Sequence, residues 1–238
     1  MVALALVGCE SRGFKAERDM YRAHKKARAI YRNPSGTPPF QFNQAVGTYQ
    51  DVMKKYPDSI FAVQAKFSIG HLFVVKGDFD RARREYKDLI VDCTKRGNLC
   101  AEAQFAIGNS YELEKRWREA EVVYKQIMQD YPFSTKSLDL PIYVINHYRK
   151  AQDQEGMVAS VDEAVSYYLG LKSRTEADKG RYILQSLVTR AYIEAGQWAD
   201  ALESLDKLSR DFPENKPEEA LWMKALIFFS KLIDKAKS

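Results

Sequence analysis

The chain has 238 residues and a formal net charge of +5, with 45% hydrophobic and 29% charged residues. So small a net charge is not typical of a dedicated nucleic-acid-binding protein. No run of 18 apolar residues occurs, so we expect no membrane-spanning helix. Apolar residues recur mostly at helical spacing, and the few alternating segments are short. We therefore expect an all-α protein.

The first nine residues end in a motif that predicts lipidation. The apolar run ends in Leu6-Val7-Gly8-Cys9, which is similar to a bacterial lipobox whose Cys thiol accepts diacylglycerol. Acyl chains contribute about 0.8 kcal/mol per buried CH₂, and several together anchor a protein stably. The run is short, and no Lys or Arg precedes it, which leaves the alternative of a cytosolic helix with an incidental Cys. We interpret residues 1–9 as a truncated lipoprotein signal.

Residues 10–39 predict a basic helix and a Pro-rich loop. Between positions 12 and 32 an apolar stripe is expected to consist of Phe14, Met20, Tyr21, Ala27, Ile30 and Tyr31. The basic side chains that lie mostly off this stripe are Arg22, Lys25, Lys26, Arg28 and Arg32. This basic face could dock on acidic lipid head groups. The favoured interpretation is a first helix that covers the end of the fold and leaves its basic face in water.

One stretch of the chain occurs twice. Residues 65–90 return 38 positions later as residues 103–128. The matched pairs are Ala65/Ala103, Phe67/Phe105, Ile69/Ile107, Gly70/Gly108, Ala82/Ala120, Tyr86/Tyr124 and Lys87/Lys125. A period of this length built from two helical segments indicates stacked helical hairpins. We expect the small residues to lie where two helices of a hairpin approach closely, and the Tyr pair to fill the space between hairpins.

The order of residues within this unit resembles that of the tetratricopeptide repeat (TPR) family. Signature positions are occupied by Gly70, Phe73, Phe79, Ala82 and Tyr86, and again by Gly108, Tyr111, Trp117, Ala120, Tyr124 and Pro132. Weaker copies contain Ala45, Tyr49, Val52 and Pro57, and Tyr192, Gly196, Trp198, Ala201, Leu205, Leu208 and Pro213. Residues 136–172 have the length of one more hairpin, with Asn146 where Gly is expected. The resemblance implies a superhelix (α-solenoid) of about five hairpins over residues 40–215, closed by a capping helix over 216–238.

Two further Cys residues bracket a joint between predicted helices. Cys93 and Cys100 stand where the repeat lacks its usual Pro. If Cys9 is lipidated, the remaining pair suits a disulfide in an oxidising compartment. A bridge that closes so short a loop would contribute about 2–3 kcal/mol. In a cytosolic protein both would instead be free thiols.

Catalytic patterns are missing from the sequence. The three His residues (24, 71 and 147) are far apart, and neither a zinc-protease spacing nor a nucleophile or phosphate-binding motif occurs. Acidic residues lie beside Lys and Arg, as on solvated helix faces. We therefore expect a protein that is not an enzyme and that needs no cofactor, metal or small-molecule substrate.

The family resemblance implies a concave binding groove lined by the first helix of each hairpin. The residues at inward positions are Gln64, Phe67, His71, Glu102, Phe105, Asn109, Glu112, Tyr143, His147 and Arg190. Phe67 and Phe105 would form an aromatic ledge suited to an extended peptide or a partner's helix. Phe67 and His71 replace the Lys and Asn with which some family members clamp a C-terminal carboxylate, so we expect no such clamp.

These features predict a non-enzymatic protein-interaction scaffold. The lipobox and repeat count resemble those of TPR lipoproteins of the bacterial outer membrane, of the β-barrel assembly or Tol–Pal-associated type. The expected location is thus the periplasmic face of the outer membrane. The alternative is a cytosolic TPR adaptor for a secretion, motility or chaperone system. A glycan-handling enzyme ranks last, because Glu102 and Glu112 are more than two helical turns apart.

Overall fold

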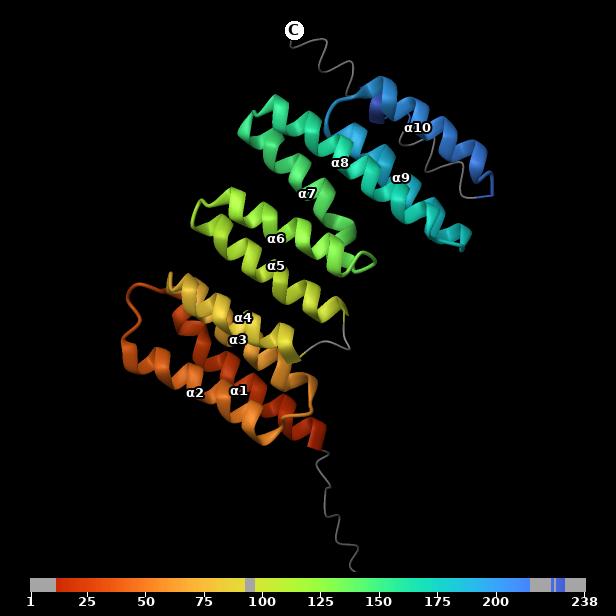
Figure 1. Ribbon diagram of the computed structural model, residues 1–238. Coiled ribbons are helices and arrows are strands. Elements are labelled where there is room, and N and C mark those ends of the chain that lie inside the picture. Colours follow the sequence, from red (N-terminus) through yellow and green to blue (C-terminus); the bar gives the residue numbers. More distant parts are fainter. Residues whose placement is uncertain (1–11, 93–96, 215–223, 225, 230–238) are drawn as a thin grey trace, which may run out of the picture. The chain divides into compact units, whose positions relative to one another are not determined.

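A computed structural model describes residues 12–92, 97–214, 224 and 226–229 (Figure 1). All regular secondary structure in these residues is helical. The helices are α1 (Arg12–Arg32), α2 (Pro39–Lys55), α3 (Ile60–Val75), α4 (Phe79–Asp92), α5 (Gly97–Leu113), α6 (Trp117–Asp130), α7 (Thr135–Ala151), α8 (Gln154–Ser173), α9 (Asp178–Glu194) and α10 (Trp198–Asp211).

Consecutive helices pair as the hairpins α1/α2, α3/α4, α5/α6, α7/α8 and α9/α10 (Figure 1). The predicted all-α fold of about five hairpins is confirmed. Most of the predicted capping helix over 216–238 lies outside the described residues. Of that segment, Ile227 is buried against Leu205, Leu208 and Phe212.

The chain divides into two compact units, Met1–Ile127 and Met128–Ser238. In the first unit α1 packs against α2 and α3, and each later helix up to α5 packs against the one before it. Its core includes Tyr49, Ile69, Leu72 and Leu89, all nearly or completely buried. In the second unit α7, α8, α9 and α10 pack in sequence, and α7 also contacts α9.

The turns of four hairpins share one backbone conformation. Gly77, Lys115, Gln152 and Gly196 all have a positive φ, between 58° and 76°. A left-handed residue at this place ends the first helix and lets the second begin within three residues. Glycine adopts this conformation without steric cost, whereas Lys115 and Gln152 adopt it at some cost in backbone energy.

The repeated glycines mark a very close contact within each of their hairpins. A Cβ atom added to Gly70 would lie 2.5 Å from Cε1 of Tyr86, and one added to Gly108 would lie closer still to Cε1 of Tyr124. Both Tyr rings are almost completely buried. Each ring therefore lies over the glycine of its own hairpin. That Tyr86 and Tyr124 also fill the space between hairpins stays a prediction.

Helix α1 buries only part of the predicted stripe, namely Met20, Ala27 and Ile30. The buried side chains are Ala16, Met20, Ala23, Ala27 and Ile30, spaced alternately by four and three residues. Phe14 and Tyr21, which were expected on the buried stripe, are 52% and 60% exposed. Alanines bring α1 close to its neighbours, which leaves no room for an aromatic ring on that face.

A buried arginine joins α4 to α5. Arg83 is 5% exposed and donates hydrogen bonds to Ser110 Oγ (3.2 Å), to Asp80 Oδ1 (2.6 Å) and to a carboxylate oxygen of Glu114. Its guanidinium lies 4.3 Å from the centre of the Tyr111 ring, and the guanidinium of Arg116 lies 4.9 Å from the same ring. Charge-assisted hydrogen bonds and stacking therefore hold two successive hairpins together.

The glycine contact generates a paired test. We expect Gly70→Ala to lower the free energy of unfolding by about 1–3 kcal/mol, because the added methyl group overpacks the contact with Tyr86. Gly47→Ala in α2 is the control, since nothing lies within 4 Å of the position that its Cβ atom would occupy. That substitution should stabilise the protein by roughly 0.5–1 kcal/mol through helix propensity. Urea denaturation measures both, and a stabilising Gly70→Ala would contradict the packing.

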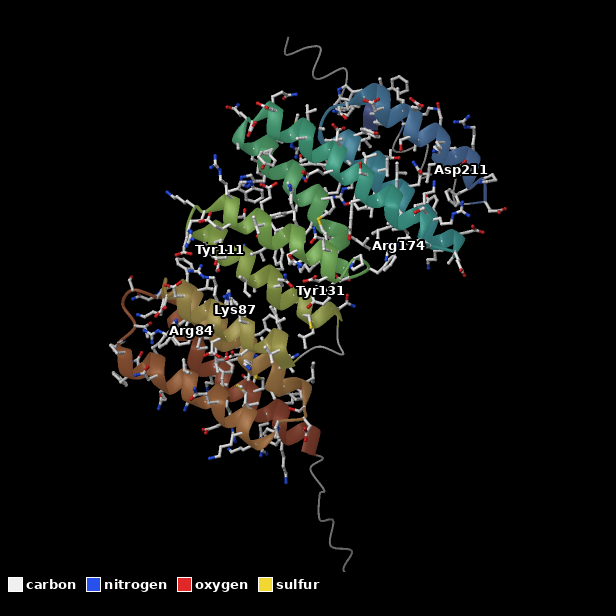
Figure 2. The ribbon with its side chains drawn as sticks, viewed as in Figure 1. Arg84, Lys87, Tyr111, Tyr131, Arg174 and Asp211 are labelled. Atoms are coloured by element: carbon white, nitrogen blue, oxygen red, sulfur yellow. The ribbon has the colours of Figure 1, made fainter. Side chains whose placement is uncertain are left out.

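The arginine network generates a second test. We expect Arg83→Ala to cost about 1.5–3 kcal/mol, because it removes several charge-assisted hydrogen bonds at a buried site. The control is Arg84→Ala, since Arg84 is exposed on the same helix (Figure 2) and should change stability by no more than about 0.5 kcal/mol. Equal melting temperatures for the two variants would show that the network contributes nothing.

Candidate functional site

The ten predicted groove residues lie on the first helices of four hairpins. Gln64, Phe67 and His71 are on α3, and Glu102, Phe105, Asn109 and Glu112 are on α5, in the first unit; Tyr143 and His147 on α7 and Arg190 on α9 belong to the second. None of them is buried, and four (Gln64, His71, Glu102 and Arg190) are exposed. The side chains are thus accessible within each unit, while their role in binding stays a prediction.

The two predicted ledge residues have a packing role as well. The ring of Phe67 lies 5.9 Å from that of Tyr86, and the ring of Phe105 stacks on Tyr124 at 5.4 Å between centroids. Each Phe is half-buried and covers the Tyr that rests on its hairpin's glycine. Substitution of either Phe would consequently disturb the hairpin as well as the surface.

Helix α1 adds residues to this surface that the sequence reasoning missed. The ring of Tyr31 lies 5.5 Å from that of His71, and His24 Nδ1 is 2.8 Å from the hydroxyl of the buried Tyr49. Desolvation lowers the pKa of His24 and raises the pKa of Tyr49, so a neutral ring faces a protonated hydroxyl. Ala16, Ala23 and Ala27 occur at helical spacing in the sequence. This pattern indicates a closely packed helix face and could have been used to assign α1 to the first hairpin.

Glu112 is held in place by a tyrosine. Its Oε2 accepts a hydrogen bond of 2.7 Å from the hydroxyl of Tyr124. Glu102 lies about 15 Å along the same helix, at 1.5 Å per residue. In the described part of the chain no group of three or more His, Cys, Asp or Glu side chains is arranged to hold a metal ion. Glu112 therefore contributes a fixed negative charge to the surface.

In the second unit the corresponding surface is linked by ion pairs. Arg149 Nη1 of α7 lies 3.2 Å from Glu194 Oε2 of α9, and Arg190 Nε lies 3.6 Å from the other oxygen of that carboxylate. His147 makes an edge contact with Tyr148 at 5.7 Å. The ion pairs connect α7 directly to α9, so His147 and Arg190 are carried on two joined helices.

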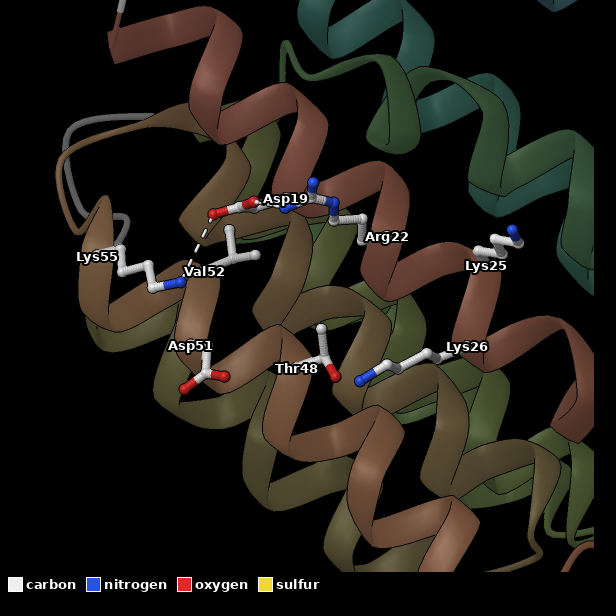
Figure 3. Close-up of a pocket in the computed structure, with 8 residues that line it drawn as sticks. All are labelled: Asp19, Arg22, Lys25, Lys26, Thr48, Asp51, Val52 and Lys55. Atoms are coloured by element: carbon white, nitrogen blue, oxygen red, sulfur yellow. Dashed lines mark hydrogen bonds and ion pairs between the residues drawn. The ribbon is translucent and has the colours of Figure 1, made fainter.

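A separate groove lies between α1 and α2. Its volume is about 560 Å³, and it is lined by Asp19, Arg22, Lys25, Lys26, Thr48, Asp51, Val52 and Lys55 (Figure 3). Asp19 lies 3.2 Å from Arg22 and 3.7 Å from Lys55, and it accepts a hydrogen bond of 3.1 Å from Tyr56. In Figure 3 Lys26 reaches across toward Thr48, whereas Lys25 points away from α2. The groove is basic, because its four cations outnumber the two carboxylates of Asp19 and Asp51.

The predicted modification sites are only partly covered by the structure. Cys9 lies outside the described residues, and so does Cys93. Cys100 is 1% exposed at the start of α5 and is disulfide-bonded. The pairing of Cys93 with Cys100 stays a prediction. Among the described helices, none combines the length and apolar character needed to cross a bilayer.

Comparisons with known proteins identify the repeat. Two family models described as tetratricopeptide repeat match the chain, one over residues 40–59 and 102–134 and the other over residues 190–231. Among solved structures, the chain is 16% identical to nearly identical TPR-like repeats assigned to a kinesin light chain of Podosopora anserina, covering 85% of this chain and 99% of that one, with a TM-score of 0.42. It is 15% identical to BtubC (BKLC) from P. vanneervenii, covering 85% and 94%, with a TM-score of 0.40.

The matched segments coincide with helices described above. They fall on α2, on most of α5 with α6, and on the last residues of α9 with α10, and so include helices of both units. The Gly108–Tyr124 contact lies within one of them. The chain therefore contains tetratricopeptide repeats.

Proposed function

We propose that the protein is a non-enzymatic scaffold that holds partner proteins on the first helices of its hairpins. TPR repeats generally bind proteins, and this supports the class of function. On α3, the exposed side chains of Gln64 and His71 lie on the same helix as the half-buried Phe67. This arrangement is the observation on which we base the proposed binding surface. Polar groups there can orient a partner segment while the aromatic ring supplies apolar contact.

We further propose that the scaffold is lipid-anchored at Cys9 and works in the bacterial periplasm, at the outer membrane. The support is the lipobox-like Leu6-Val7-Gly8-Cys9 and the even pair Cys93 and Cys100 that remains. A disulfide is typical of an oxidising compartment. The partners would then be other proteins of the cell envelope.

Site-specific photo-crosslinking tests the binding surface. A photoreactive amino acid placed at Gln64, His71 or Glu102 should give the same crosslinked partner in cells of the source organism, because these side chains are exposed on the proposed surface. Lys87 on α4 is the control position, since it is exposed on a second helix of a hairpin (Figure 2). No adduct at all three sites, or equal adducts at Lys87, would contradict the proposal. Phe67 and Phe105 are left intact because both support the fold.

The intact mass of the protein from its native membrane tests the anchor. We expect a mature chain that begins at Cys9, is heavier by acyl groups, and gains two hydrogen atoms on reduction. The acyl groups follow from the lipobox, and the hydrogen gain follows from the predicted Cys93–Cys100 bridge. An unlipidated chain with free thiols would overturn the envelope location and favour a cytosolic TPR adaptor instead.

A further inference from the structure

The charge of the protein is concentrated on one helix. The sequence of α1 holds eight Lys and Arg residues and two acidic residues, a net charge of +6 with His neutral. The whole chain has a net charge of +5, so everything outside α1 together has a net charge of −1. A single helix of 21 residues thus accounts for the basic character of the protein.

The cations and two exposed rings form one stripe along α1. The stripe comprises Phe14, Tyr21, Lys25, Arg28 and Arg32, which are all exposed and share one face of the helix. It lies opposite the buried stripe that packs against α2 and α3, because the two sets are offset by about half a helical turn. Phe14 and Tyr21 are 52% and 60% exposed. We call this set the outer stripe of α1.

The charges of the outer stripe are poorly neutralised by the protein itself. Asp19, one of the two acidic residues of α1, lies toward α2 and pairs with Arg22 and Lys55. Within the residues described, neither Lys25 nor Arg28 forms an ion pair, and Figure 3 shows Lys25 pointing away from α2. The stripe therefore presents net positive charge and aromatic surface to whatever lies outside the helix.

We propose that the outer stripe of α1 docks the protein on a bilayer surface that contains anionic lipids. The stripe runs the length of a helix of about 30 Å, which matches an extended planar polyanion better than a single acidic motif. Aromatic rings between cations suit the interface, where the rings lie among the head groups and the cations face the phosphates. This docking is independent of Cys9 acylation, so its failure and the failure of the lipid anchor are distinguishable.

The test uses the full chain with Cys9→Ser, so that no acyl group contributes to binding. Co-sedimentation is measured at physiological ionic strength with vesicles of phosphatidylcholine alone and with vesicles in which one lipid in three is phosphatidylglycerol. We expect binding to the anionic vesicles only. Lys25→Glu/Arg28→Glu should weaken it at least tenfold, because each cation near the surface contributes to the attraction. Phe14→Ser/Tyr21→Ser should weaken it several-fold.

Matched controls separate the stripe from net charge and from general surface hydrophobicity. Lys150→Glu/Lys179→Glu changes the net charge equally, at exposed positions of the second unit. Phe40→Ser/Ile60→Ser removes two apolar side chains that are 68% and 53% exposed. Both controls should bind like the parent, and circular dichroism should show that all variants are folded.

Other outcomes would overturn the proposal. These are no binding to anionic vesicles, full binding by Lys25→Glu/Arg28→Glu, or an equal loss in the Lys150→Glu/Lys179→Glu control. Full binding by Phe14→Ser/Tyr21→Ser would show that the rings do not enter the interface. Binding of soluble polyglutamate without binding of vesicles would identify an acidic protein as the occupant instead.

Discussion

The hairpins at the centre of this fold depend on the contact of a tyrosine ring with a glycine. Gly70 and Gly108 have no side chain, so the rings of Tyr86 and Tyr124 lie directly on the first helix of the hairpin. That close approach buries the rings and places Phe67 and Phe105 over them. The half-exposed aromatic surface of α3 and α5 is thus a consequence of helix packing. The proposed binding surface and the stability of these hairpins therefore depend on the same residues.

The fold could be predicted from the sequence because the same pattern of small and aromatic residues occurs twice. Small and aromatic residues occupy matching positions in residues 65–90 and 103–128. A repeat of this length is compatible with few helical folds. The buried stripe of α1 was predicted only in part, because aromatic residues were given priority over Ala16 and Ala23. In that helix close approach decides burial, and Ala23 and Ala27 permit it where Tyr21 does not.

The candidate site was predictable only in outline. Family spacing identified exposed positions such as Gln64 and His71, but it could not show that Tyr31 of α1 lies beside His71. That contact depends on the path of the chain from α1 to α2 and then to α3, which the loop sequence does not specify. The Arg83 network was also missed, because Arg83 has no counterpart in the second copy, where Glu121 occupies the equivalent position. Features present in only one repeat leave no pattern to detect.

The glycine–tyrosine contact is not present in every hairpin, and this difference between hairpins helps the chain to avoid misfolding. Counted from the left-handed residue of the turn, the equivalent positions hold Ile145 and Val161 in the α7/α8 hairpin, and Thr189 and Leu205 in the α9/α10 hairpin. Where the second helix lacks the large ring, the first helix has a side chain in place of glycine. Repeat proteins are liable to pair a helix with the wrong copy of its partner during folding. A second helix with tyrosine, such as α4 or α6, would clash with a first helix that carries Ile145 or Thr189, so it fits α3 and α5 but neither α7 nor α9.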